Sequence, residues 1–137
     1  MKKNKKIIRD WYIVDAKDQI LGRLSTKIAR VLYGKDEINF SPNVDSGDYI
    51  IVINAQAVKL SGRKSESKVY RRHTGYPGGL KEEPFLKLLE RKPEDIIKKA
   101  VKGMLPKNKI AREAIKRLKV YRGEDYKEKD IKLKELK

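Results

Sequence analysis

The segment YIIVINA, Tyr49 to Ala55, constrains the fold most, because it is almost wholly apolar and rich in β-branched residues. A run of this kind predicts a strand covered on both faces, as in a parallel sheet. Before it, WYIVD (Trp11 to Asp15) predicts a shorter strand, and Gly34 suits the residue after the end of a helix between the two. The apolar stripe of that helix comprises Leu21, Leu24, Ile28, Val31 and Leu32. Strand, helix and buried strand in this order predict a βαβ unit.

The second half of the chain predicts three more helices, in PFLKLLERK, PEDIIKKAVKGM and NKIAREAIKRLKV. Pro93 suits the first position of the second of these, and Pro106 breaks the chain before the third. KVYRRH and VYRGED predict short strands, and GYPGG predicts a loop. The length of 137 residues favours one domain, residues 10–126, with a basic arm at 1–9 and a charged tail of weak helical propensity at 127–137.

Charge and cysteine content narrow the classes of function. Lys and Arg number 35 against 19 Asp and Glu, so the net charge is +16. Such an excess repels itself in a compact fold, and nucleic acid is the commonest polyanion that relieves it. With no Cys and one His, we expect no disulfide, metal or cofactor. No apolar run approaches the ~18 residues of a membrane span.

Two windows hold most of the excess positive charge. From Lys59 to Lys81 there are seven basic residues and one acidic, and from Lys98 to Lys119 nine basic and one acidic. An ordinary solvated helix face usually carries mixed signs and (i, i+4) pairs. We therefore expect the helices to dock through their apolar stripes and to present a cationic outer face to a polyanion.

The segment KGMLPKNK, Lys102 to Lys109, places cations around a bend. Gly103 allows another backbone to come close, and the helix after the bend aims free N–H groups outward, which favours phosphate. A plain helix–helix turn uses Gly and Pro as well, so the pattern alone leaves both interpretations open.

The segment YRRHTGYPGGLK, Tyr70 to Lys81, contains the only histidine and allows three interpretations. A catalytic His73 needs an orienting carboxylate and a nucleophile, and nothing in the sequence assembles them. A core histidine is the second interpretation. In the third, the segment is a binding surface, where arginine forks match phosphate oxygens and glycines leave room for a close backbone. Tyr70 and Tyr76 then stack on bases or riboses, or else belong to the core.

The chain also carries four blocks in a fixed order: DWYIVDAKDQILGRLSTKIARVLYGK, VDSGDYIIVINA, HTGYPGG and RKPEDIIKKAVKGMLPKNKIAR. From about Trp11 to Gly123 it resembles the L-thirteen family of large-ribosomal-subunit proteins, bacterial type. The resemblance implies an α/β fold with three α/β/α layers and a mostly parallel sheet of about four strands. It also implies a structural protein of the cytoplasmic ribosome, without enzymatic activity. Its partners would be 23S ribosomal RNA, bound early in large-subunit assembly, and neighbouring large-subunit proteins.

The family's RNA-facing segments fall on residues 73–79 and 102–112, which the charge pattern also selects. Together they give these RNA-binding candidates: Arg63, Lys64, Arg71, Arg72, His73, Thr74, Gly75, Tyr76, Gly78, Gly79, Lys81, Lys102, Lys107, Lys109, Arg112, Lys116, Arg117, Lys119 and Arg122.

Other classes of function fit the sequence less well. A nucleoid-type DNA-binding protein is the main alternative, because charge alone does not distinguish DNA from RNA, but no helix-turn-helix, zinc-finger or basic-zipper pattern occurs. SGRKSES lacks the Gly-Lys-Ser/Thr ending of a phosphate loop, which argues against binding of a nucleoside triphosphate. We expect no small-molecule substrate. A membrane-surface protein would need an exposed apolar helix face, whereas these stripes suit a core.

Overall fold

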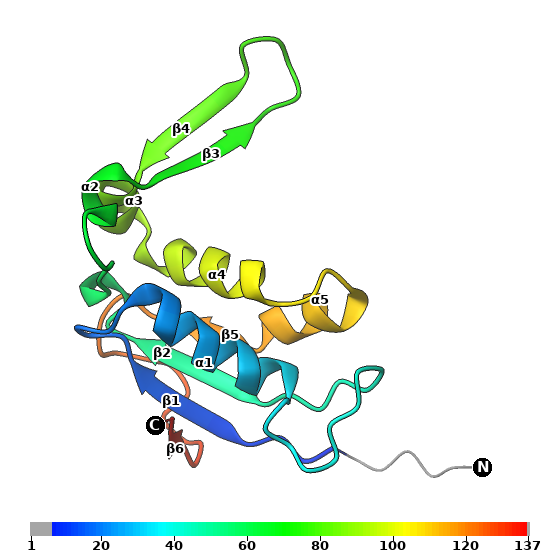
Figure 1. Ribbon diagram of the computed structural model, residues 1–137. Helices are drawn as coiled ribbons and strands as arrows, with labels where there is room; N and C mark the ends of the chain where they lie inside the picture. The colour runs from blue at the N-terminus through cyan, green and yellow to red at the C-terminus, as the bar shows by residue number, and fades with distance from the viewer. Residues whose placement is uncertain (1–6, 137) are drawn as a thin grey trace.

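The computed structural model describes residues 7–136 and is built on a parallel sheet of four strands, ordered β5-β2-β1-β6 (Figure 1). These strands are β1 (Trp11–Asp15), β2 (Tyr49–Ile53), β5 (Leu118–Val120) and β6 (Lys134–Glu135). The α/β class and the mostly parallel sheet are therefore confirmed. Residues 1–6 of the predicted basic arm lie outside the described residues.

Strand β2 is the centre of the fold. It pairs with β1 on one side and β5 on the other, and Ile50, Ile51 and Val52 are completely buried. Three consecutive buried residues in a strand point alternately to the two faces, so both faces of β2 are covered. This confirms what the β-branched run predicts.

Helix α1 (Leu21–Tyr33) connects β1 to β2, and every residue of its predicted apolar stripe is buried. The helix ends at Gly34, whose φ of 77° is left-handed and whose N–H donates to the last-turn carbonyls of Arg30 and Val31. Glycine adopts this conformation without a Cβ clash, which makes it the natural end of the helix. The βαβ unit is confirmed.

The later helices are α3 (Phe85–Arg91), α4 (Pro93–Met104) and α5 (Lys109–Lys116), and two short elements, η1 (Ala55–Ala57) and α2 (Lys64–Ser67), precede them. Because α1 contacts both α4 and α5, these three helices lie on one face of the sheet. In Figure 1, α1 lies in front of β2 and the segment after β5 runs behind it. Helices α1, α4 and α5 thus form the layer on one side of the sheet, and the extended segment after β5 passes on the other side.

The structure corrects two predictions near the C-terminus. The last helix ends at Lys116 rather than continuing, because Leu118 and Val120 alternate into the core as strand β5. Residues Lys134–Glu135 form β6 beside β1 instead of a helical turn. The tail thus contributes an edge strand to the sheet, and residue 126 is not the end of the folded unit.

A separate two-stranded hairpin projects from the body (Figure 1). It consists of β3 (Val69–His73), which the sequence predicts, and β4 (Leu80–Pro84), which it does not. Most side chains beyond Tyr70 in this hairpin are exposed. Because a two-stranded ribbon alone is marginally stable in water, its attachment at the base sets its position.

We predict that Ile51→Asp prevents folding. Placing an unpaired carboxylate in the completely buried centre of β2 costs several kcal/mol, which is comparable with the ~5–15 kcal/mol stability of a typical domain. The same change at the fully exposed Ile38 is the control, and that variant should unfold like the wild type. Circular dichroism during urea denaturation measures both; a cooperative transition for Ile51→Asp would show that β2 is not the core strand.

Candidate nucleic-acid interface

The tip of the hairpin is a tight turn held by its own backbone. The Thr74 N–H donates to the Gly79 carbonyl at 3.1 Å, and the Gly79 N–H donates to the Tyr76 carbonyl at 2.9 Å. Gly75 has a φ of 87°, and a Cβ on Gly79 would lie 2.0 Å from the Thr74 hydroxyl oxygen. The glycines are thus needed inside the turn itself. They leave Thr74 and Tyr76 on its surface, with the Tyr76 side chain 75% exposed.

His73 ends strand β3 and is exposed. Its Nδ1 accepts the Gly75 N–H at 2.9 Å, which assigns the proton of the neutral ring to Nε2. Exposure excludes the core-histidine interpretation. Among the hydrogen bonds of the described residues, none joins His73 to a carboxylate, so the orienting group that catalysis needs is missing there. The geometry favours the binding-surface interpretation.

The hairpin strands place cations directly opposite each other. Arg71 is paired, because its Nε donates to Glu82 across the ladder at 2.6 Å. Arg72 lies opposite Lys81, and neither has a salt bridge to any described residue. Like charges directly opposite each other destabilise a sheet, so an anion bound between Arg72 and Lys81 would relieve repulsion.

Tyr70 does not offer a free ring for stacking. It is half-buried against the core at the hairpin base, and burial raises the pKa of its hydroxyl. The ammonium groups of Lys68 and Lys99 lie 5.4 Å and 5.1 Å from its ring centroid. Of the two tyrosines in this segment, only Tyr76 presents an open face. Arg63 and Lys64 are exposed beside the same base, at the start of α2.

A second exposed group of cations surrounds the bend between α4 and α5, at the end of α4 away from the hairpin (Figure 1). Asn108 caps α5, since its side-chain oxygen accepts the Ala111 N–H at 2.9 Å. That bond occupies one of the N–H groups at the start of α5 that would otherwise be free for phosphate. The exposed cations of the bend are Lys102, Lys107, Lys109 and Arg112.

Three of the predicted site residues lie elsewhere. Lys116 is exposed but pairs with Glu113 at 2.9 Å, and Arg122 donates to the Glu90 carbonyl at 3.1 Å. Lys119 pairs in register with Ile51, and its neighbours Leu118 and Val120 face the helices. Lys119 therefore points to the opposite face of the sheet, because side chains alternate along a strand.

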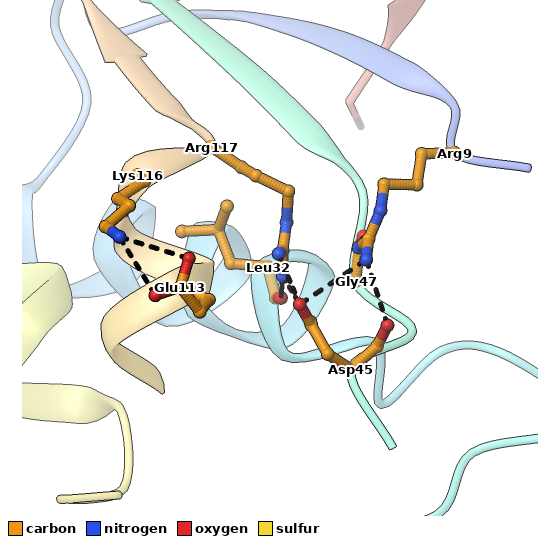
Figure 2. A network of polar contacts seen from close by, with 7 residues as sticks. All are labelled: Arg9, Leu32, Asp45, Gly47, Glu113, Lys116 and Arg117. Atoms are coloured by element: carbon orange, nitrogen blue, oxygen red, sulfur yellow. Dashed lines mark hydrogen bonds and ion pairs between the residues drawn. The ribbon is translucent and has the colours of Figure 1, made fainter. Parts of the chain in front are cut away.

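Arg117 is buried, so the prediction that it belongs to the cationic outer face is wrong (Figure 2). Its two terminal nitrogens donate to the two carboxylate oxygens of Asp45 at 2.6 and 2.7 Å, and one also donates to the Leu32 carbonyl at 3.0 Å. Arg9 contacts the same carboxylate at 3.4 Å and also bonds the Gly47 carbonyl. Arg117 thus ties the end of α5 to the end of α1 and to the loop before β2.

The described residues contain no cluster of three or more His, Cys, Asp or Glu side chains arranged to hold a metal ion. No helix in this part of the chain has the length and apolar character needed to cross a bilayer. The described residues instead present two separate regions rich in exposed cations, the hairpin and the bend.

Comparison with known proteins gives consistent matches. The family model "Ribosomal protein L13" matches residues 9–127. A large ribosomal subunit protein uL13 from Syntrophotalea carbinolica is 54% identical over 124 residues, covering 90% of this chain and 87% of the relative. Those from Geobacter sp. (strain M21) and Prochlorococcus marinus (strain MIT 9312) are each 55% identical, covering 88% of this chain and 85% and 84% of the relatives. All are named as ribosomal proteins rather than enzymes.

We predict that Arg117→Met destabilises the fold by about 3 kcal/mol, because it leaves the Asp45 carboxylate partly buried without its main partner. The adjacent Lys116→Met removes an exposed pair and should cost less than about 1 kcal/mol. Urea denaturation of both variants gives the two free energies of unfolding. Equal values for the two variants would contradict the structural role of Arg117.

Proposed function

The chain belongs to the ribosomal protein L13 family of the large ribosomal subunit, and from that premise we propose that it binds 23S ribosomal RNA and supports early subunit assembly. It would work in the cytoplasm as part of the ribosome, beside other proteins of the large subunit. The proposal assigns RNA contact to the hairpin and to the α4–α5 bend.

The observation that carries the proposal is the facing pair Arg72 and Lys81 on a hairpin with little core of its own. Such a ribbon is costly to maintain in isolation, since its like charges repel and few of its side chains are buried. Phosphate groups lying along the hairpin would neutralise these cations. Contact with a polyanion therefore explains both the projection and its composition.

The cationic side chains and the exposed tyrosine would contact different parts of the RNA. Lysines and arginines contact phosphates, which supplies most of the affinity without reading sequence. The open ring of Tyr76 at the tip is suited to stack on an unpaired base. Protein side chains cannot read the bases in the deep, narrow groove of an RNA helix. Specificity for 23S ribosomal RNA would therefore come from the folded shape of the RNA, which places RNA loops beside both the hairpin and the bend.

We predict that Lys107→Glu with Lys109→Glu weakens binding to transcribed 23S ribosomal RNA at least tenfold while the thermal unfolding temperature stays within a few degrees of the wild type. Both lysines are exposed at the bend, so reversal removes phosphate contacts without opening the core. Lys129→Glu with Lys132→Glu, also exposed, is the control of equal charge and should lose less affinity.

Duplex DNA of equal length, added as a competitor, separates this proposal from the DNA-binding alternative. Ribosomal RNA should compete far better than DNA for the wild-type protein. Equal competition, or equal losses in the two double variants, would mean that binding reflects net charge alone, and the proposed function would then fail.

A further inference from the structure

A groove lies between the hairpin and helices α3 and α4, and four of its cations are absent from the candidates that the sequence gives. The groove is lined by residues of β3, β4, α3 and α4, with Tyr70 among them. Figure 1 shows the hairpin rising from α3 beside the start of α4. Besides Arg71, which pairs with Glu82 across the ladder, the cations that line it are Arg72, Lys81, Lys87, Arg91, Lys92 and Lys99.

One face of the hairpin contributes most of its part of the lining, although Arg71 and Glu82 of the other face line the groove as well. Tyr70 lies opposite Glu83 in the ladder and Arg72 lies opposite Lys81, so these four side chains share a face. All four line the groove. The wall that the hairpin contributes therefore contains the same facing cations that have no salt bridge.

Two contacts fix the distance between the walls. Arg91 of α3 donates to both carboxylate oxygens of Glu83, at 3.0 and 2.7 Å, which lowers the pKa of that carboxyl and raises the pKa of the guanidinium. Lys99 of α4 lies over the Tyr70 ring at 5.1 Å. The groove is thus braced at its base by a charged pair and a cation–π contact.

The charge of the groove is not balanced by the protein. Arg91 is paired with Glu83, but Arg72, Lys81, Lys87, Lys92 and Lys99 form no salt bridge within residues 7–136. Asp95 is the one other carboxylate on the lining besides Glu82 and Glu83. Five unpaired cations on facing walls form a site for an extended anion.

We propose that this groove binds the sugar–phosphate backbone of the same RNA that contacts the hairpin tip. The inference rests on the proposed function and extends it to α3 and α4. The groove is suited to phosphates rather than bases, because its aromatic ring is already covered by Lys68 and Lys99. RNA is favoured over an acidic peptide because Arg72 and Lys81 belong to the groove and to the hairpin at once, so one continuous polyanion satisfies both.

The test uses the full-length triple variant Lys87→Gln, Lys92→Gln and Lys99→Gln. All three lysines are exposed and lie outside the RNA-binding candidates that the sequence gives. The matched control carries Lys17→Gln, Lys129→Gln and Lys132→Gln, which remove the same charge from exposed positions away from the groove lining. Binding to transcribed 23S ribosomal RNA is measured over a range of salt, and thermal unfolding confirms that both variants fold.

Each phosphate contact contributes about 0.7 to 0.9 to the slope of log K against log salt, so losing three should flatten the slope by about 2 to 3. The control should keep a slope close to the wild type. A groove variant that matches the control, beside a wild type that binds RNA steeply, overturns the groove site but leaves the proposed function intact. A wild type without salt-dependent RNA binding overturns both.

A polyglutamate competitor tests the other class of occupant. One outcome would contradict the proposal: the groove variant binds RNA as tightly as the wild type, and polyglutamate displaces RNA from the wild type but not from the variant. The groove would then bind acidic peptide. If polyglutamate competes no better with the wild type than with the groove variant, and the slope flattens as expected, RNA backbone is the occupant.

Discussion

Burial of β2 on both faces is the constraint on which the rest of the molecule depends. The apolar residues of this strand have to be covered on both faces. Helices α1, α4 and α5 cover one face and the segment after β5 passes the other, while β1 and β5 pair with the two edges (Figure 1). Apolar burial of this kind is the dominant favourable term in folding. Once the helices are fixed on that core, their remaining faces and connections are free to be polar and cationic.

The arrangement around β2 determines where the cations are presented. Helix α4 packs on α1 and has the bend to α5 at one end, while α3 and the hairpin lie at its other end (Figure 1). Arg117 and Asp45 hold the C-terminal end of α5 near the end of α1, which fixes the position of α5 and so of the bend before it. Arg91 and Glu83 hold the hairpin base to α3 in the same way. Internal ion pairs thus position elements whose exposed cations are left for a partner.

Much of the fold follows from local patterns. The helical stripe of α1, the buried run of β2 and the glycine at the end of α1 are each determined by residues close in sequence, so the sequence predicts them. The sequence does not predict strand β4, because LKEEP has no strand pattern of its own and becomes a strand through its ladder with β3. Strand β6 is not predictable for a similar reason, since pairing with the edge of β1 decides its conformation.

The same difference between local and long-range contacts decides which residues of the candidate site the sequence predicts. Charge density in the sequence selects the hairpin and the bend, because their cations are consecutive or nearly so. The sequence does not predict the burial of Arg117, because its partner Asp45 lies 72 positions away. A helical pattern extended past Lys116, where α5 ends, places Arg117 on the outer face instead. The sequence does not predict the groove, because Lys87, Arg91 and Lys92 stand among glutamates and only the fold brings them beside Arg72 and Lys81.

The most direct test of the central claim is ultraviolet crosslinking in intact cells, followed by sequencing of the attached RNA and identification of the crosslinked peptides. The account predicts 23S ribosomal RNA as the main attached RNA, with crosslinks concentrated in residues 70–81 and 102–112. Crosslinks confined to other surfaces of the protein, or an attached RNA population without 23S ribosomal RNA, would contradict it.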